Sequence, residues 1–245
     1  MIKGNKMIKI GICGCSGKMG TRVLNIAAAD KGISVVLGLE AKGHPSIGSK
    51  IAQGEVSDDC DDIKAADVLI DFTAPEATME HLTAAVRHNK AMVIGTTGLS
   101  EEQVSRIREA AKKIPVVFSP NMSIGVNLLF RLVKEAAGKL SKEYRVNMVE
   151  AHHIHKKDAP SGTAKKLAQI IKEASMRDVE DIKSIREGEI VGDHKVIFDS
   201  SYDTIELSHS AKTRDIFAKG AVAAAKFVYK KKPGLYDMQD VIANP

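Results

Sequence analysis

The first half of the chain consists of short apolar runs that alternate with segments of helical periodicity. The apolar runs lie at residues 7–13, 33–39, 67–72, 91–94 and 115–119. Helices are predicted at 18–29, 75–88 and 101–113, the last with the capping-box pair Ser100 and Gln103. Gly and Pro residues interrupt the stretch 41–62, which is predicted to be mostly loop. Because strands and helices alternate, the pattern predicts right-handed βαβ units and a parallel sheet.

After about residue 123 this rhythm changes. A helix is predicted at roughly 126–139, then a strand at 144–151, a polar loop at 152–160 and a helix at 161–174. Strand-like segments follow near 182–187, 194–200 and 203–210, with the sequence DSSYD at 199–203 as a hairpin turn. This part is predicted to be α+β with a mixed sheet. The last predicted helix, an Ala-rich segment at about 214–231, fits against either half.

Composition and charge narrow the class of protein. The chain has 245 residues, of which 44% are hydrophobic and 27% charged, as in ordinary globular proteins of one large or two small domains. Its 36 basic and 31 acidic side chains leave a net charge of +5, which suits anionic small molecules better than nucleic acid. Aromatic residues make up 4%, and no apolar run approaches the ~20 residues of a membrane span. We therefore expect neither a nucleic-acid nor a membrane partner.

Cysteine usage and the N-terminus bear on the compartment. The three cysteines, Cys13, Cys15 and Cys60, are an odd number without zinc-site spacing, so a reducing compartment, the cytoplasm, is expected. The N-terminus lacks a signal-peptide core. The tripeptide Met-Ile-Lys occurs at 1–3 and again at 7–9, which makes Met7 a candidate alternative start.

A glycine-rich turn, GCSGKMG at 14–20, joins the first predicted strand to the first helix. Glycines there allow the backbone to approach a pyrophosphate, and the helix N-terminus offers free N–H groups. Glu40 ends the second strand, 20 residues after Gly20, where an acidic side chain binds the adenosine ribose of a dinucleotide. The spacing G-x-x-G-x-x-G departs from G-x-G-x-x-G, and an ordinary tight βα turn is the alternative. A P-loop is excluded, because Ile12 and Met19 replace two of its required residues.

Cys13 and Cys15 flank Gly14 and have two interpretations. They form a redox or metal site, or they are small residues that fill a crowded turn, which the pattern favours.

A basic loop in the second half carries groups suited to acid–base chemistry. Every residue of 152–157 except Ile154 is His or Lys, and the sequence PSGT at 160–163 then begins a helix. Imidazoles, ammonium groups and helix N-terminal amides together suit a carboxylate or phosphate substrate and a proton donor. A solvated loop is one alternative; a metal site at His152, His153 and His155 is another, which the adjacent lysines disfavour.

Six motifs resemble the dihydrodipicolinate reductase family, whose members are also called 4-hydroxy-tetrahydrodipicolinate reductases. They are GCSGKMG at 14–20, DFTxPE at 71–76, GTTG at 95–98, NMSIGVN at 121–127, EAHHIHKKDAPSGTA at 150–164 and GLYDMQDVI at 234–242. The resemblance covers essentially the whole chain, and the fifth motif is the most specific. It implies a Rossmann-type dinucleotide domain of residues 1–123 and 214–245, with an inserted substrate-binding and oligomerisation domain of residues 124–213. It also implies a homotetramer and, in lysine and diaminopimelate biosynthesis, dehydration and NAD(P)H reduction of 4-hydroxy-tetrahydrodipicolinate.

The resemblance also implies roles for single residues. His152 is the expected proton donor and acceptor and Lys156 the second proton donor, with no metal. Substrate carboxylates are expected on His153, Ser161, Gly162 and Thr163. NADH or NADPH is expected against Gly14, Cys15, Ser16, Gly17, Lys18, Met19, Glu40, Gly95, Thr96, Thr97, Ser119, Pro120, Asn121 and Met122. Some members place an arginine after the acidic residue, but here Ala41 and Lys42 follow Glu40, which leaves the choice between the two cofactors open.

Two other functions remain alternatives at this point. Another two-domain amino-acid dehydrogenase shares the dinucleotide half but lacks the basic loop. A non-catalytic NAD(P)-sensing regulator keeps the glycine turn and Glu40 but needs no proton donor beside a carboxylate site.

Overall fold

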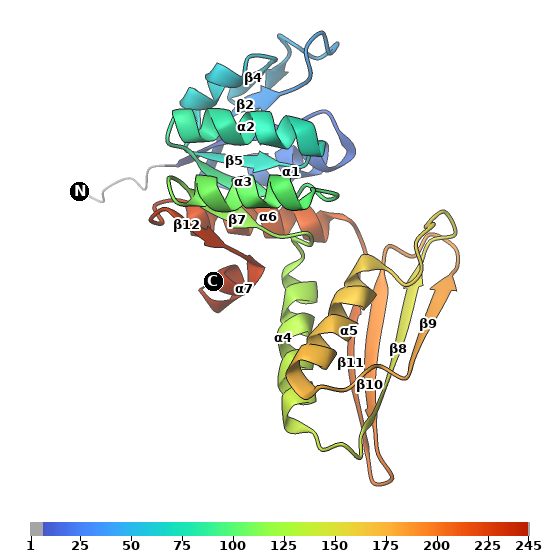
Figure 1. The fold of residues 1–245 in the computed structure, drawn as a ribbon. Helices are drawn as coiled ribbons and strands as arrows, with labels where there is room; N and C mark the ends of the chain where they lie inside the picture. The colour runs from blue at the N-terminus through green and yellow to red at the C-terminus, as the bar shows by residue number, and fades with distance from the viewer. Residues whose placement is uncertain (1–6, 245) are drawn as a thin grey trace, which may run out of the picture. The chain divides into compact units, whose positions relative to one another are not determined.

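A computed structural model describes residues 7–244 and divides them into two compact units (Figure 1). One unit runs up to Ser123 and resumes at Phe217, and the other comprises Ile124–Ile216. The question of Met1 or Met7 as the start concerns residues that lie outside the described part.

The first unit is built on an eight-stranded sheet with the order β12-β7-β6-β5-β1-β2-β4-β3. Its strands are β1 (Ile8–Cys13), β2 (Ile33–Leu39), β3 (Lys50–Ile51), β4 (Gly54–Ser57), β5 (Val68–Asp71), β6 (Ala91–Ile94), β7 (Pro115–Phe118) and β12 (Gly234–Tyr236). All neighbouring pairs are parallel except β3 and β4. The order reverses between β1 and β5, as in Rossmann folds, so the predicted fold class is confirmed.

Helices cover both faces of this sheet, which explains why its strands are continuously apolar. The helical elements are α1 (Lys18–Ala28), the 3₁₀ helix η1 (Cys60–Ala65), α2 (Pro75–Arg87), α3 (Glu101–Ala111), α6 (Asp215–Val228) and α7 (Met238–Ala243). α1 and α6 share one core cluster with Ile10 and Ile70, whereas η1, α2 and α3 share the other with Leu69 and Met92. α6 therefore belongs to the core of the first unit. No helix in residues 7–244 is long and apolar enough to cross a membrane.

Two regions differ from the sequence-based expectation. The stretch 41–62, predicted as mostly loop, contains β3, β4 and the start of η1. β12 and α7 near the C-terminus were not predicted, and β12 pairs with β7 at the sheet edge. These strands have two to four residues and only one or two apolar side chains each, so they lack the continuous apolar run that reveals the equally short β5, β6 and β7.

The second unit is a four-stranded mixed sheet with two helices on one face. The order is β11-β10-β8-β9, formed by β8 (Arg145–His152), β9 (Asp181–Arg186), β10 (Asp193–Asp199) and β11 (Thr204–Ser210). The helices α4 (Ile124–Lys139) and α5 (Gly162–Ser175) pack on Val146, Met148, Val196 and Phe198. Because strand side chains alternate, Glu150 and His152 of β8 lie on the same helix-covered face as Met148.

Candidate active site

The predicted cofactor residues follow the carboxyl ends of neighbouring parallel strands. The glycine turn follows β1, Glu40 follows β2, Gly95–Thr97 follow β6 and Ser119–Met122 follow β7. In open parallel sheets such ends form the ligand-binding crevice, at the point where the strand order reverses. The fold thus brings these separate segments together at the carboxyl ends of the parallel strands.

The glycine turn needs its glycines for three different reasons. Gly14 has φ of +71°, a left-handed conformation that favours glycine. A Cβ on Gly20 would lie 1.9 Å from the carbonyl oxygen of Gly14, so the helix could not approach the strand. Gly17 is the N-cap of α1 and supplies no side-chain cap, which leaves the first helical amides to an anion. The turn fits a pyrophosphate.

Glu40 is tied directly to the glycine turn. Its Oε1 accepts a 2.6 Å hydrogen bond from the backbone N–H of Ser16. The Ser16 hydroxyl contacts the Ser46 hydroxyl at 3.0 Å, and His44 Nδ1 lies 2.7 Å from the same Ser46 oxygen. Sequence reasoning missed His44 and Ser46, because they lie in a stretch predicted as featureless loop. The loop after β2 is thereby joined to the turn beside which the ribose is expected.

The side chains of Cys15 and Met122 pack in the core. A Cβ on Gly38 would lie 2.6 Å from Cys15 Sγ, so this thiol points onto β2. Burial raises the pKa of the Cys15 thiol, whereas the N-terminus of a helix would lower it. Cys13 is also fully buried, with its pKa raised mainly by burial. Both cysteines fit the interpretation as residues that fill a crowded turn.

A buried carboxylate organises the GTTG segment. Asp71 Oδ1 accepts hydrogen bonds from the hydroxyls of Thr73, Thr78 and Thr96, and its Oδ2 lies 2.7 Å from His81 Nδ1. Burial alone would raise the pKa of Asp71, but the hydrogen bond from His81 and those from Thr73 lower it. Thr96, predicted to line the cofactor, is therefore held in place by the buried Asp71 carboxylate.

In the second unit an ion pair with a buried carboxylate supports the basic loop. Arg186 of β9 donates to Glu150 of β8 from both terminal guanidinium nitrogens, at 3.0 Å from Nη1 to Oε2 and 2.8 Å from Nη2 to Oε1. Burial would raise the pKa of Glu150, but hydrogen bonds from Arg186, Ser184 and His152 lower it to about 2. The carboxylate is thus ionised at neutral pH.

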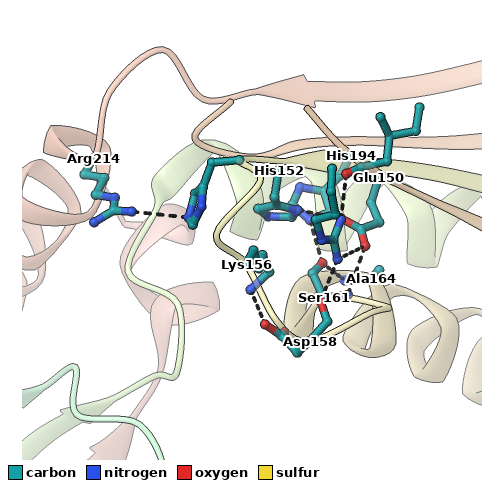
Figure 2. Close-up of polar contacts among 11 residues, drawn as sticks. Glu150, His152, Lys156, Asp158, Ser161, Ala164, His194 and Arg214 are labelled. Carbon is teal, nitrogen blue, oxygen red and sulfur yellow. Dashed lines mark hydrogen bonds and ion pairs between the residues drawn. The ribbon is translucent and has the colours of Figure 1, made fainter. Parts of the chain in front are cut away.

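His152 contacts this carboxylate directly (Figure 2). Its Nδ1 lies 2.5 Å from Glu150 Oε2, and its ring packs edge-on against His194 of β10, with centroids 5.1 Å apart. Burial lowers the pKa of His152, and Glu150 opposes that shift. A Cβ on Gly192 would lie 3.0 Å from His152 Nε2, so a side chain at position 192 would crowd this nitrogen.

Two other predicted groups of the loop have charged neighbours of their own. Lys156 Nζ pairs with Asp158 Oδ1 at 2.8 Å, and its positive charge acts on His152. His153 Nε2 lies 3.5 Å from a guanidinium nitrogen of Arg214. Figure 2 shows Lys156 and its partner Asp158 near His152, and Arg214 farther from His152 on another segment.

The N-terminal end of α5 contacts both Glu150 and His194. Ser161 is the N-cap, and its hydroxyl accepts from the Ala164 N–H at 3.2 Å and contacts His194 Nε2 at 3.0 Å. The Ser161 N–H donates to Glu150 Oε1 at 3.3 Å, so this amide is directed at the buried carboxylate. Gly162 faces open space, where a Cβ would meet nothing within 4 Å, and Thr163 follows it in the first turn.

Sequence reasoning missed four residues here: Glu150, Arg186, His194 and Arg214. For Glu150 a signal was present, because residues two apart in a strand share a face. Arg186 and His194 come from other strands, whose register the sequence does not reveal.

Two family models match the chain. Residues 8–122 match the dihydrodipicolinate reductase N-terminus, and residues 125–242 match the dihydrodipicolinate reductase C-terminus. Curated relatives named 4-hydroxy-tetrahydrodipicolinate reductase include those of Syntrophus aciditrophicus, 41% identical, and Syntrophotalea carbinolica, 42% identical. Both alignments cover 96% of this chain, with 98% and 99% of the relatives.

Solved structures agree with these matches. A dipicolinate-bound dihydrodipicolinate reductase from Paenisporosarcina sp. TG-14 superposes with a TM-score of 0.83 at 25% identity, covering 96% of this chain and 98% of that one. A probable dehydrogenase from Thermotoga maritima, 12% identical with a TM-score of 0.65, shares the fold and covers 96% of this chain and 93% of its own.

Proposed function

Since the chain belongs to the dihydrodipicolinate reductase family, we propose that it is an NAD(P)H-dependent oxidoreductase that acts on 4-hydroxy-tetrahydrodipicolinate in diaminopimelate and lysine biosynthesis. The substrate, NAD(P)H and a proton give tetrahydrodipicolinate, NAD(P)⁺ and water. The hydride comes from the nicotinamide, and this chain must supply the proton and hold the ring.

One observation carries the proposal. His152 and the N-terminus of α5 contact the buried Glu150 carboxylate, and Lys156, whose charge acts on His152, belongs to the same short segment. Such an arrangement offers two proton donors beside backbone amides that suit carboxylates. A regulator that binds the dinucleotide but catalyses no reaction needs neither proton donor.

We assign the two proton donors as follows. His152 gives or takes a proton at Nε2, because Nδ1 is engaged by Glu150. Lys156 is the second donor, held near His152 by Asp158.

The substrate carboxylates are assigned to the cationic and amide groups around these donors. They are His153, Ser161, Gly162 and Thr163. Arg214, which lies against His153, adds a guanidinium on the same side. A planar ring with two carboxylates matches this distribution of charge.

The first unit is proposed to hold the cofactor. The turn Gly14–Met19 would receive the pyrophosphate, and Glu40 would accept hydrogen bonds from the ribose. The segments Gly95–Thr97 and Ser119–Met122 lie at the same edge of the sheet, with the buried side chain of Met122 acting as packing. Residues 124–213 are proposed to bind substrate and to form the contacts between subunits.

The test is a turnover assay with freshly formed condensation product of pyruvate and aspartate semialdehyde. We expect loss of NADH or NADPH absorbance that depends on this substrate, with competitive inhibition by dipicolinate that weakens as ionic strength rises. Absence of turnover with both cofactors would contradict the proposed function.

The assembly and compartment are part of the same proposal. The face of the second sheet opposite α4 and α5 bears a pocket of about 390 Å³ with Val149, Ala151 and Ile197 in its lining. Apolar side chains on an uncovered sheet face favour a contact with another copy of this chain, and we propose a homotetramer. Free thiols at all three cysteines fit the cytoplasm, which fractionation of the source cells tests.

A further inference from the structure

We infer that Glu150, itself held by Arg186, is a positioning residue that fixes the His152 imidazole with its proton on Nδ1 and so presents Nε2 as the atom that transfers the proton. The catalytic part of this inference rests on the proposed function. The structural part concerns one carboxylate, one guanidinium and one imidazole, and it stands on their geometry.

Glu150 can only accept a hydrogen bond at its contact with His152. The residue is 0% exposed, and its pKa of about 2 keeps it ionised, so neither oxygen carries a proton at neutral pH. The 2.5 Å contact between Glu150 Oε2 and His152 Nδ1 therefore requires the hydrogen on Nδ1. In a neutral imidazole the lone pair then resides on Nε2.

Arg186 makes this arrangement rigid. Its guanidinium grips both oxygens of Glu150 and also donates to the backbone carbonyls of Ile185 at 2.7 Å and Asp158 at 2.6 Å. Asp158 in turn pairs with Lys156. One partly buried guanidinium thus connects the support of His152 to that of the second proton donor.

The charges around His152 show what Glu150 contributes. Facing its ring are Glu150 from β8, Arg186 from β9, His194 from β10 and Lys156 from the basic loop. Burial is the largest influence on the pKa of His152 and lowers it, Lys156 and Arg186 lower it further, and only Glu150 raises it. Without Glu150 the imidazolium that a proton donor needs would be destabilised.

A purely structural ion pair would not require this geometry. Glu150 and Arg186 satisfy each other with two hydrogen bonds, so a stable pair needs no histidine. The contact with Nδ1 leaves Nε2 on the opposite side of the ring, where Gly192 has no side chain, and no partner for Nε2 is found within the described residues. When Nε2 gives up its proton, the neutral ring keeps its Nδ1–H bond to Glu150, so the transfer does not disturb the support.

Nuclear magnetic resonance of the wild-type enzyme tests the tautomer directly. Protein labelled with ¹⁵N at histidine gives imidazole signals, and the signal of His152 is assigned by its loss in His152→Asn. We expect the Nδ1–H tautomer in wild type, whatever the enzyme's activity. A dominant Nε2–H tautomer would overturn the inference.

Glu150→Gln tests the role of the charge. An amide held by Arg186 through its oxygen turns its NH₂ toward Nδ1, so we expect the Nε2–H tautomer and a pKa of His152 lower by about 1 unit or more. kcat is expected to fall about 10²-fold at neutral pH, with KM for the substrate changed less than about threefold. Asp178→Asn, which breaks the exposed pair with Lys172, is the matched control and keeps wild-type values.

The outcomes separate this inference from the proposed function. An unchanged tautomer and pKa in folded Glu150→Gln, or a fall in kcat/KM through KM alone, would overturn it. Should that variant fail to fold, Arg186→Lys takes its place. It keeps the charge and leaves Glu150 an acceptor, so we expect the Nδ1–H tautomer to persist, while the loss of the two-pronged contact lowers kcat more than it changes KM. A switch to the Nε2–H tautomer or an unchanged kcat in this variant would overturn the inference. Absence of turnover in wild type would overturn the proposed function, while the tautomer measurement still decides the placement of the proton.

Discussion

At the scale of single residues, the basic loop separates proton transfer from binding. His152→Ala and Lys156→Ala are expected to lower kcat by about 10²–10⁴-fold, the usual effect of losing a general acid. Thr163→Ala is expected to raise KM more than it lowers kcat, because its proposed role is to bind a carboxylate. Steady-state kinetics with Lys157→Ala as the exposed neighbouring control checks this, and near-wild-type kcat in both donor variants would contradict the assignment.

The thiols provide a second prediction at this scale. Cys13 and Cys15 are buried, and burial raises the pKa of both, so little thiolate is available to react. Burial raises the pKa of Cys60 as well, but this residue, at the start of η1, is half-buried and therefore more accessible than the other two. We expect a thiol reagent to label Cys60 first in the native protein, and the other two only after unfolding. Mass spectrometry of a time course measures this order, and labelling of Cys15 as fast as Cys60 would refute it.

At the scale of elements, the glycine turn joins β1 to α1 at a distance that excludes a side chain. Gly20→Ala would place a methyl group within 1.9 Å of the Gly14 carbonyl oxygen, so the turn must open. We expect a loss of about 1–3 kcal/mol in stability and at least about tenfold weaker NADH binding.

A matched control lies in α4. A Cβ on Gly138 would have no neighbour nearer than 3.8 Å, so Gly138→Ala is expected to stabilise the chain by up to about 1 kcal/mol. Urea unfolding and NADH titration measure both variants. Unchanged NADH affinity in Gly20→Ala would show that the turn does not hold the cofactor.

Elements with a continuous apolar run or a long helical period were predictable from the sequence, and strands defined by their pairing were not. β2 and β6 have the predicted bounds, because a continuous apolar run can only be buried. β4 was missed because its pairing with β2, not its own pattern, makes it a strand.

The same distinction applies to the candidate site. The basic loop is a local motif and was visible. Arg186 stands beside His152 only because β8 and β9 pair in one particular register, which residue spacing does not encode.

At the scale of the whole molecule, the second sheet has one face that no helix of its own unit, residues 124–216, covers. Ile197 lies there among half-buried side chains, so Ile197→Asp is expected to split the proposed tetramer into smaller species by burying a charge. Met176→Asp, at an 80% exposed position with φ of 57° that Asp tolerates, is the control. Light scattering measures the mass of the assembly. The proposed interface would be contradicted if the wild-type protein were a monomer, or if Ile197→Asp formed an assembly of wild-type mass.

The stability of the folded chain toward acid depends on the buried histidines and on Glu150. Burial is the main cause that lowers the pKa of His194, and the charge of His152 is the second. Together they bring it to about 4, from an ordinary value near 6.5. Below pH 6.5 the unfolded chain therefore takes up a proton that the folded chain refuses until about pH 4, so stability falls as the pH falls through this window. Glu150 acts lower, because its pKa of about 2 lies below the ordinary 4.5, and its contribution is lost between those values.

His194→Gln separates these two windows. One proton of difference corresponds to about 1.4 kcal/mol per pH unit, so removing this imidazole is expected to flatten the slope of unfolding free energy between pH 6.5 and 4 by up to that amount. The loss below pH 4.5, caused by Glu150, is expected to remain. Urea unfolding at closely spaced pH values measures the slope in both pH windows, with His155→Gln, at an exposed position, as the control. An unchanged slope of unfolding free energy in His194→Gln would show that this histidine is protonated equally in the folded and unfolded chain. The loss of stability between pH 6.5 and 4 would then originate in other buried groups.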